Sequence, residues 1–185
     1  MQVSILCGGK SSRMQSEKGL VLYLNKPFIE YVIDAVLPIS KNIQLITNTK
    51  DYDYLNYKKG NDIVKDKGPI GGIYTALTYS ETELNLILSC DIPLISTEIL
   101  VELIEKHDSN NAITVFSDVN KTHPLIGIYS KKCLPILQKS IDNNDLKIMN
   151  LLTKVNHQII NVEGIKRDFL KNINTVAQLK ELNTY

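Results

Sequence analysis

The residues best suited to chemistry stand in a glycine-rich stretch near the start of the chain. Gly8 and Gly9 follow a short apolar run, and two cations, Arg13 and Lys18, come shortly after them. Glycine has no Cβ, so the backbone N–H groups of such a loop can approach a phosphate closely. Arginine and lysine add full positive charges to those dipoles. We therefore expect this loop to bind a polyphosphate.

Two well-known phosphate-binding motifs do not fit this stretch. Gly9-Lys10-Ser11 matches the end of a P-loop, but that motif needs a glycine where the chain has Ser4. The dinucleotide motif G-x-G-x-x-G also fails, because the two glycines are adjacent and no third glycine follows in register. The stretch must therefore belong to another kind of phosphate-binding loop.

A single carboxylate is the best candidate for a metal ligand. Asp91 comes shortly after residues 84–89, the most apolar stretch of the chain, which predicts a central strand. Open α/β sheets bind their ligands just beyond the carboxyl ends of such strands. Mg²⁺ needs only one or two carboxylates beside phosphate oxygens and water, so Asp91 suits a magnesium site. The alternative role is that of an ordinary turn aspartate.

The elements that must position these groups alternate between strands and helices. Strands are predicted in the run before Gly8 and at 42–47, 63–64, 84–89, 112–116, 122–129 and 157–162. Helices are predicted after Pro27, after the glycines at 68–72, after Ser96, over 133–142 and 147–155, and after Thr175. This alternation predicts an α/β fold with a mostly parallel sheet and helices on both faces.

Length, charge and cysteine usage limit the classes of function. The 185 residues fit a single domain over 1–185, and the net charge of +1 leaves no basic excess for a nucleic-acid partner. The apolar runs are shorter than the roughly 18 residues of a membrane span, so we expect no membrane partner. The three cysteines are widely spaced without a C-x-x-C zinc pattern, which indicates reduced thiols and a cytoplasmic location.

The motifs resemble those of one enzyme family. The first loop reads L-x-G-G-x-S-x-R-M followed closely by a lysine, which resembles the signature of nucleotidyltransferases that release pyrophosphate from a nucleoside triphosphate. Within that group it is most similar to the molybdenum cofactor guanylyltransferases. The resemblance covers 6–182 and includes G-P-I-G-G-I at 68–73, C-D-I-P at 90–93 and N-I-N-T at 172–175.

The resemblance implies both a fold and a reaction. The fold is a three-layer Rossmann-like nucleotidyltransferase fold, and the reaction transfers GMP from GTP to molybdopterin with Mg²⁺ as cofactor. Transient contact with molybdenum cofactor biosynthesis proteins, or with the enzymes that accept the product, is also implied. The chain departs from the family loop at Cys7, Gln15 and Glu17, where alanine, glycine and aspartate are usual.

The resemblance also implies which residues form the site. The candidate catalytic residues are Arg13, Lys18 and Asp91, and Asp91 is also the candidate metal ligand. The residues expected at GTP are Leu6, Cys7, Gly8, Gly9, Lys18, Asn48, Asp66 and Asp91. Asn172 and Asn174 are expected at the molybdopterin end, and they alternate along an extended segment, 168–174, so both should point the same way.

Some of these assignments have alternatives. Asp62 competes with Asp66 for the guanine site, and Asn48 and Asp66 are also ordinary turn residues at strand ends. Asn172 and Asn174 also suit backbone capping before the final helix.

Two other functions remain open. A cytidylyltransferase of the same fold would act on molybdopterin or a small alcohol phosphate, although the resemblance at Gly8 and at 90–93 favours GTP. A non-catalytic nucleotide-binding module is supported only by the departures at Gln15 and Glu17. The retained cations and Asp91 argue against it.

Overall fold

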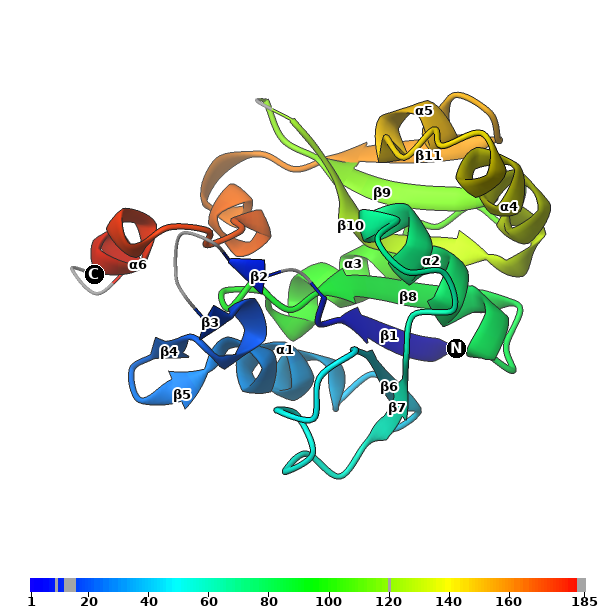
Figure 1. Cartoon of the computed structure of the whole chain (residues 1–185). Coiled ribbons are helices and arrows are strands. Elements are labelled where there is room, and N and C mark those ends of the chain that lie inside the picture. The colour runs from blue at the N-terminus through cyan, green and yellow to red at the C-terminus, as the bar shows by residue number, and fades with distance from the viewer. Residues whose placement is uncertain (9, 12–15, 120, 183–185) are drawn as a thin grey trace.

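The computed structural model describes residues 1–8, 10–11, 16–119 and 121–182. Within them, the centre of the molecule is a seven-stranded sheet in the order β11-β9-β10-β8-β1-β6-β7 (Figure 1). Its strands are β1 (Gln2–Leu6), β6 (Ile43–Ile46), β7 (Lys58–Gly60), β8 (Leu84–Ser89), β9 (Ile113–Ser117), β10 (Thr122–Ser130) and β11 (His157–Asn161). Every pairing is parallel except those of β10 with β8 and β9. The predicted mostly parallel sheet is confirmed.

Helices cover both faces of this sheet, as the sequence predicts (Figure 1). One layer contains α1 (Phe28–Val36) and α3 (Thr97–Glu105), and the other contains α2 (Gly68–Tyr79), α4 (Leu134–Asp142) and α5 (Ile148–Leu152). The central strand β8 shows how the two layers share the sheet. Leu86 and Leu88 belong to the apolar cluster of the first layer, and Ile87 between them belongs to that of the second.

Short elements gather beyond the carboxyl ends of the parallel strands (Figure 1). They are β2 (Lys10–Ser11), β3 (Ser16–Glu17), η1 (Lys18–Leu20), β4 (Leu22–Tyr23), β5 (Lys26–Pro27), η3 (Gly164–Leu170) and α6 (Val176–Leu182). A further short turn, η2 (Lys131–Cys133), leads into α4. A third apolar cluster joins Val21 and Phe28 to Ile173, with Leu179 of α6 packed against it. The last part of the chain is therefore attached to the first.

Two local predictions are wrong. Residues 63–64 are not a strand, because the edge strand β7 lies earlier, at Lys58–Gly60. Its composition is polar, but its backbone pairs with β6 from Gln44 to Ile46, and lysines are common on exposed sheet edges. Residues 168–170 are not extended, because the 3-10 helix η3 continues to Leu170 and places that side chain in the first apolar cluster.

None of the helices in the described part of the chain combines the length and the apolar character needed to span a membrane.

Candidate functional site

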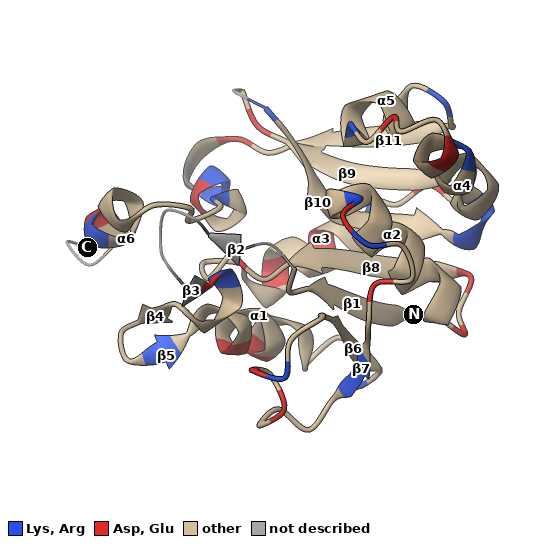
Figure 2. Ribbon diagram, in the orientation of Figure 1, with Lys and Arg blue, Asp and Glu red and all other residues tan. Residues whose placement is uncertain are grey.

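Charged and polar side chains from three distant segments meet at the carboxyl edge of the sheet. Lys18 opens η1, Asp91 follows β8, and residues 172–174 connect η3 to α6. Figure 2 shows an acidic and a basic residue side by side at the end of β3, where η1 begins. The sequence predicts that these residues share a site, and the structure brings Lys18, Asp91 and both asparagines together.

The Asp91 carboxylate is held at both oxygens. Oδ1 accepts a hydrogen bond from Ser89 Oγ at 2.5 Å and another from Asn172 Nδ2 at 2.7 Å. Oδ2 lies 3.1 Å from Lys18 Nζ. The Asp91 side chain is only 4% exposed, so this ion pair is shielded from water on the carboxylate side. A carboxylate with this many partners has a fixed orientation.

The Lys18 ammonium bridges Asp91 and the C-terminal segment. Besides the ion pair, Nζ donates to Asn174 Oδ1 at 2.5 Å. An ammonium has three N–H donors, so a third donor is left for an anion after these two contacts. The Lys18 side chain is 27% exposed, so it keeps an open side toward solvent. Lys18 can therefore contact a phosphate without leaving Asp91.

Residues 172–174 form a strap across Asp91. The backbone N–H of Ile173 donates to the Asp91 carbonyl oxygen at 2.9 Å, and the Ile173 side chain is buried in the third apolar cluster. Because Ile173 points into that cluster, its two neighbours both face the site. A capping box follows, in which Thr175 and Gln178 exchange hydrogen bonds between side chain and backbone. The predicted capping box and the common direction of the two asparagines are confirmed.

A second polar pair lies where β6 and β7 end. Asn48 Nδ2 donates to Asp62 Oδ2 at 2.7 Å, and Asp62 N donates back to Asn48 Oδ1 at 2.9 Å. Asp66 is exposed, has a φ of 59°, and makes no hydrogen bond to Asn48. The reason is the position of β7, because a strand that ends at Gly60 delivers Asp62 to the sheet edge. Asp62 therefore joins Asn48, and Asp66 does not.

The described part of the glycine-rich loop has open space beside it. A methyl group added at Gly8 would meet no described atom within 4 Å, so packing does not explain this glycine. Leu6 O and Cys7 N are already used in hydrogen bonds with the neighbouring strand ends, at Cys90 N and Ile46 O. Gly9 and Arg13, both expected to contact the nucleotide, lie outside the described residues.

The glycines at the start of α2 have a packing role. A methyl at Gly72 would lie 3.2 Å from the Leu6 side chain, and one at Gly71 would lie 3.1 Å from the Val64 carbonyl oxygen. These distances are tight for a Cβ, so α2 approaches β1 and its preceding loop closely because the side chains are absent.

Two thiols lie beneath the site. Cys7 and Cys90 directly follow the neighbouring strands β1 and β8 and are each 1% exposed. Burial, and then the adjacent Cys90 thiol, raise the pKa of Cys7 well above its usual range. A buried protonated thiol is a poor nucleophile, so the cysteine in the glycine-rich loop has a structural role.

The Asp91 region fits a magnesium ion in one specific way. In the part of the chain that the structure describes, no group of three or more His, Cys, Asp or Glu side chains is placed to hold a metal. Mg²⁺ is nevertheless commonly bound by one carboxylate together with substrate phosphates and water. Among the described residues, Asp91 Oδ2 contacts only Lys18 Nζ, which is itself partly exposed, so a single-carboxylate site suits these residues.

Sequence reasoning missed two contributors to this site. Ser89 donates directly to Asp91. The sequence does indicate this contact, because Ser89 stands two positions before Asp91 and residues i and i+2 lie on the same side of a strand. Gly19 was also missed. A methyl there would lie 2.8 Å from the Tyr52 hydroxyl oxygen and 3.1 Å from Cys90 Cβ.

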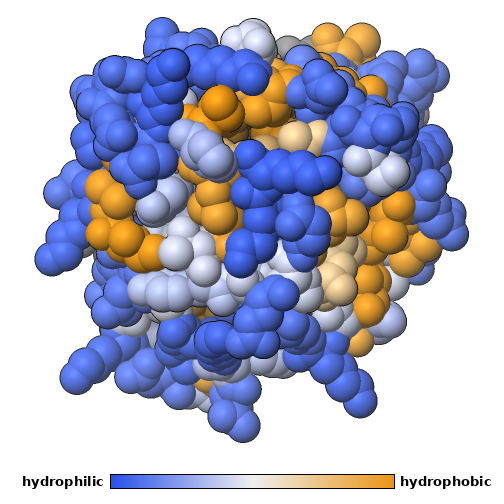
Figure 3. Space-filling model, turned by 90° about the vertical axis from the view of Figure 1, so that its right-hand side faces the viewer, coloured by the Kyte–Doolittle hydropathy of each residue, from blue (hydrophilic) through white to orange (hydrophobic). Residues whose placement is uncertain are grey.

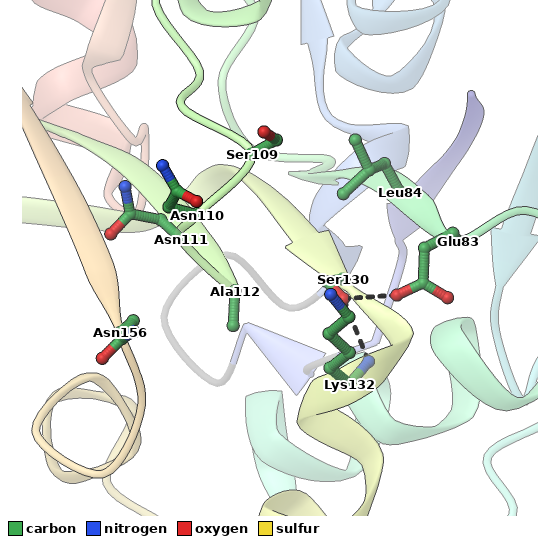
Figure 4. A pocket seen from close by; sticks show the side chains of 9 residues that line it. All are labelled: Glu83, Leu84, Ser109, Asn110, Asn111, Ala112, Ser130, Lys132 and Asn156. Carbon is green, nitrogen blue, oxygen red and sulfur yellow. Dashed lines mark hydrogen bonds between the residues drawn. The ribbon is translucent and has the colours of Figure 1, made fainter.

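Two cavities of the described structure lie away from the cluster. A cavity of about 460 Å³ opens at the opposite edge of the sheet, where Glu83 and Lys132 lie near a group of asparagines (Figure 4). Figure 3 views the molecule from its side away from the cluster and shows a mostly hydrophilic surface with separate apolar patches. A smaller cavity of about 330 Å³ lies beside β7 and contains Lys58 and Tyr79. Neither cavity includes Lys18 or Asp91.

Comparison with known proteins gives consistent similarities. Residues 3–159 match the family model described as a MobA-like NTP transferase domain. The chain is 64% identical over 179 residues to a probable molybdenum cofactor guanylyltransferase of Flavobacterium johnsoniae. This alignment covers 97% of this chain and 94% of that protein. A probable molybdenum cofactor guanylyltransferase of Carboxydothermus hydrogenoformans is 36% identical, over 98% of this chain and 94% of that protein.

A solved structure shows the same fold. It is that of molybdopterin-guanine dinucleotide biosynthesis protein A from Archaeoglobus fulgidus, with a TM-score of 0.85 and 23% sequence identity. The match covers 100% of this chain and 97% of that chain. The three-layer arrangement, with its mostly parallel sheet, is therefore shared over nearly all of both chains.

Proposed function

Because this chain belongs to the MobA-like NTP transferase family, we propose that it transfers GMP from GTP to molybdopterin and releases pyrophosphate. The observation that supports this most directly is the cluster of Lys18, Asp91 and the strap asparagines at the carboxyl edge of the sheet. The names of the similar proteins support guanine as the base and the molybdenum cofactor as the acceptor.

The reaction joins two anions. A phosphate oxygen of molybdopterin attacks the α-phosphorus of GTP, and the bond from that phosphorus to the β-bridging oxygen breaks. The bonding electrons leave with pyrophosphate, and the product is the guanine dinucleotide form of the cofactor. Because both partners are negatively charged, the protein must align them and neutralise charge.

Lys18 and Asp91 have complementary roles in this proposal. Lys18 directs its remaining N–H donor at the triphosphate while Asp91 and Asn174 hold its ammonium in place. Asp91 would hold Mg²⁺ through Oδ2, and the ion, when bound, supplies positive charge that neutralises the triphosphate. No described atom lies within 4 Å of a methyl built at Gly8, which is compatible with the same phosphates lying beside it.

Asn48 and Asp62 are the side chains best arranged to read the base. Guanine presents two N–H donors and one carbonyl acceptor on its pairing edge. A carboxylate accepts from both donors, and an amide nitrogen donates to the carbonyl. The two side chains already hold each other, so the pair is fixed before the base arrives.

The strap is the proposed acceptor side. Asn172 and Asn174 belong to it, and their amide groups can also bind the phosphate and polar edge of a pterin. All three cysteines are free and buried, which agrees with work in a reducing cytoplasm. Transient contact with proteins that supply molybdopterin or receive its dinucleotide form is part of the proposal.

The test is pyrophosphate release from GTP, CTP, UTP and ATP, measured separately with purified molybdopterin and excess Mg²⁺. We expect release with GTP, dependence on molybdopterin, and loss of the signal when EDTA removes the metal. Faster release with CTP would favour the cytidylyltransferase. Binding of GTP without any release, in the presence of verified molybdopterin, would favour the non-catalytic module.

A further inference from the structure

Ser89 donates a hydrogen bond to the candidate metal ligand Asp91 and has no role yet in the proposed chemistry. We infer that Ser89 is a positioning residue that determines which oxygen of Asp91 faces the metal. This inference rests on the proposed role of Asp91 as the magnesium ligand. It assigns Ser89 no contact with GTP or molybdopterin.

The two oxygens of Asp91 are used differently. Oδ1 accepts from Ser89 Oγ at 2.5 Å and from Asn172 Nδ2 at 2.7 Å. A carboxylate oxygen has about two lone-pair directions, so these two donors occupy Oδ1. In the described part of the chain, Oδ2 contacts Lys18 Nζ at 3.1 Å. The oxygen with a lone pair to spare is therefore Oδ2.

Of the two donors to Oδ1, Ser89 is the one built into the sheet. It is the last residue of the central strand β8, is 7% exposed, and pairs with Leu6 of β1. Asn172 instead belongs to the strap, outside the sheet, and is a proposed contact of the acceptor. Ser89 therefore keeps Asp91 oriented when the acceptor draws the Asn172 amide away.

Loss of the Ser89 hydroxyl should let the carboxylate rotate. Groups that orient a metal ligand through a hydrogen bond commonly change metal affinity by about 10–100-fold when they are removed. The binding of GTP without metal should stay the same, because the Ser89 hydroxyl donates to Asp91 Oδ1 and is assigned no contact with GTP. A general loss of stability would instead lower the affinity for metal and the affinity for GTP together.

The experiment measures Mn²⁺ binding by electron paramagnetic resonance, with and without GTP, in Ser89→Ala, Ser89→Thr and the wild type. Ser130→Ala is the matched control, because Ser130 is a buried serine whose Oγ donates to Glu83 at 2.6 Å, far from the site. We expect Mn²⁺ affinity in the presence of GTP to fall about tenfold or more in Ser89→Ala. Ser89→Thr and Ser130→Ala should stay within about twofold of the wild type.

Three outcomes decide the inference. Equal Mn²⁺ affinity in Ser89→Ala and the wild type overturns it, and so does an equal loss in Ser130→Ala. If Ser89→Ala does not fold, Ser89→Cys replaces it, and wild-type affinity in that variant, whose thiol is a weak donor, also overturns the inference. A wild type that binds Mn²⁺ with GTP in a Ser89-dependent way, yet never releases pyrophosphate, would reject the proposed function and leave the role of Ser89 intact.

Discussion

At the residue scale, the site depends on an ammonium that has protein partners before any substrate is present. Lys18 contacts Asp91 and Asn174, which come from opposite halves of the chain. Such contacts reduce the rotamer freedom that a lysine would lose on binding a phosphate. They also place the positive charge beside the carboxylate that is expected to hold the metal.

Lys18→Met removes this charge and keeps a long side chain. We expect turnover to fall by about 10²–10³-fold, the range seen when one group that stabilises developing charge is lost. Pyrophosphate release measures this, with the melting temperature as the check on folding. Lys132→Met, at an exposed lysine on the opposite edge, is the control and should stay within twofold. An equal fall in turnover in both variants would show that Lys18 acts as an ordinary surface residue.

The Asn48–Asp62 pair, proposed to read the base, gives a second prediction, with a control built into the sequence. Asp62→Asn should weaken GTP binding about tenfold or more, because the carboxylate proposed to accept two hydrogen bonds from guanine is replaced by an amide. Asp66→Asn, four positions later and exposed, should leave binding within twofold. Calorimetry with GTP compares the two variants. A larger loss in Asp66→Asn would restore the assignment that the sequence favours.

At the scale of elements, η1 holds Lys18 in place because it fits closely against the core. Gly19, the next residue, lies directly over Tyr52, whose side chain is fully buried. The Tyr52 hydroxyl has no hydrogen-bond partner in the described part of the chain. Burial raises the pKa of Tyr52 far above its usual range, so the hydroxyl stays neutral. The glycine is thus required by packing, independently of any ligand.

Gly19→Ala should therefore displace η1 and destabilise the fold by about 1–3 kcal/mol, the usual cost of overpacking. The added methyl would lie 2.8 Å from the Tyr52 hydroxyl oxygen. Tyr52→Phe removes that oxygen and should be close to neutral, because the hydroxyl is buried without a partner. The double variant should recover part of the loss. Urea denaturation of all four proteins measures the coupling, and strict additivity would contradict this account.

The elements differ in how far the sequence could predict them. Residues 84–89 are apolar because β8 is covered on both faces, so composition is sufficient to identify this strand. The edge strand β7 contains two lysines and is defined by backbone pairing, which leaves no apolar signal. The predicted strand at 63–64 placed Asp66 at a strand end, which is why the sequence favours Asp66 over Asp62 for the guanine site.

The site was predictable to a similar degree. Alternation along 172–174 predicts that the two asparagines face one way, but their partners are set by tertiary contacts. Lys18 and Asn174 are 156 positions apart, and spacing gives no information at that distance. Ser89 donates to Asp91 only two positions later, so the spacing of these two residues was enough to predict their contact.

At the scale of the whole molecule, buried thiols link stability to alkaline pH. Burial raises the pKa of Cys133 from 9.0 to about 12. The unfolded thiol therefore loses its proton near pH 9 while the folded one keeps it. Because the folded state binds more protons above pH 9, stability falls as the pH rises.

We expect the free energy of unfolding to fall by about 1 kcal/mol from this thiol between pH 8 and pH 10. The raised pKa of Cys7 adds a fall in the same direction. Urea denaturation at the two pH values measures it, with Cys133→Ala as the comparison. The variant should show a smaller fall, and an identical fall in both proteins would contradict the prediction.

The strap has a consequence for protein synthesis. Lys18 leaves the ribosome early, but its partner Asn174 is translated 156 residues later. A chain that terminates after residue 159 would contain the whole segment matched by the family model, and still lack the strap. Such a product would hold Lys18 and Asp91 without the side chains that fix them. The candidate site is therefore complete only after translation has passed the strap, and shortened chains are not expected to consume GTP.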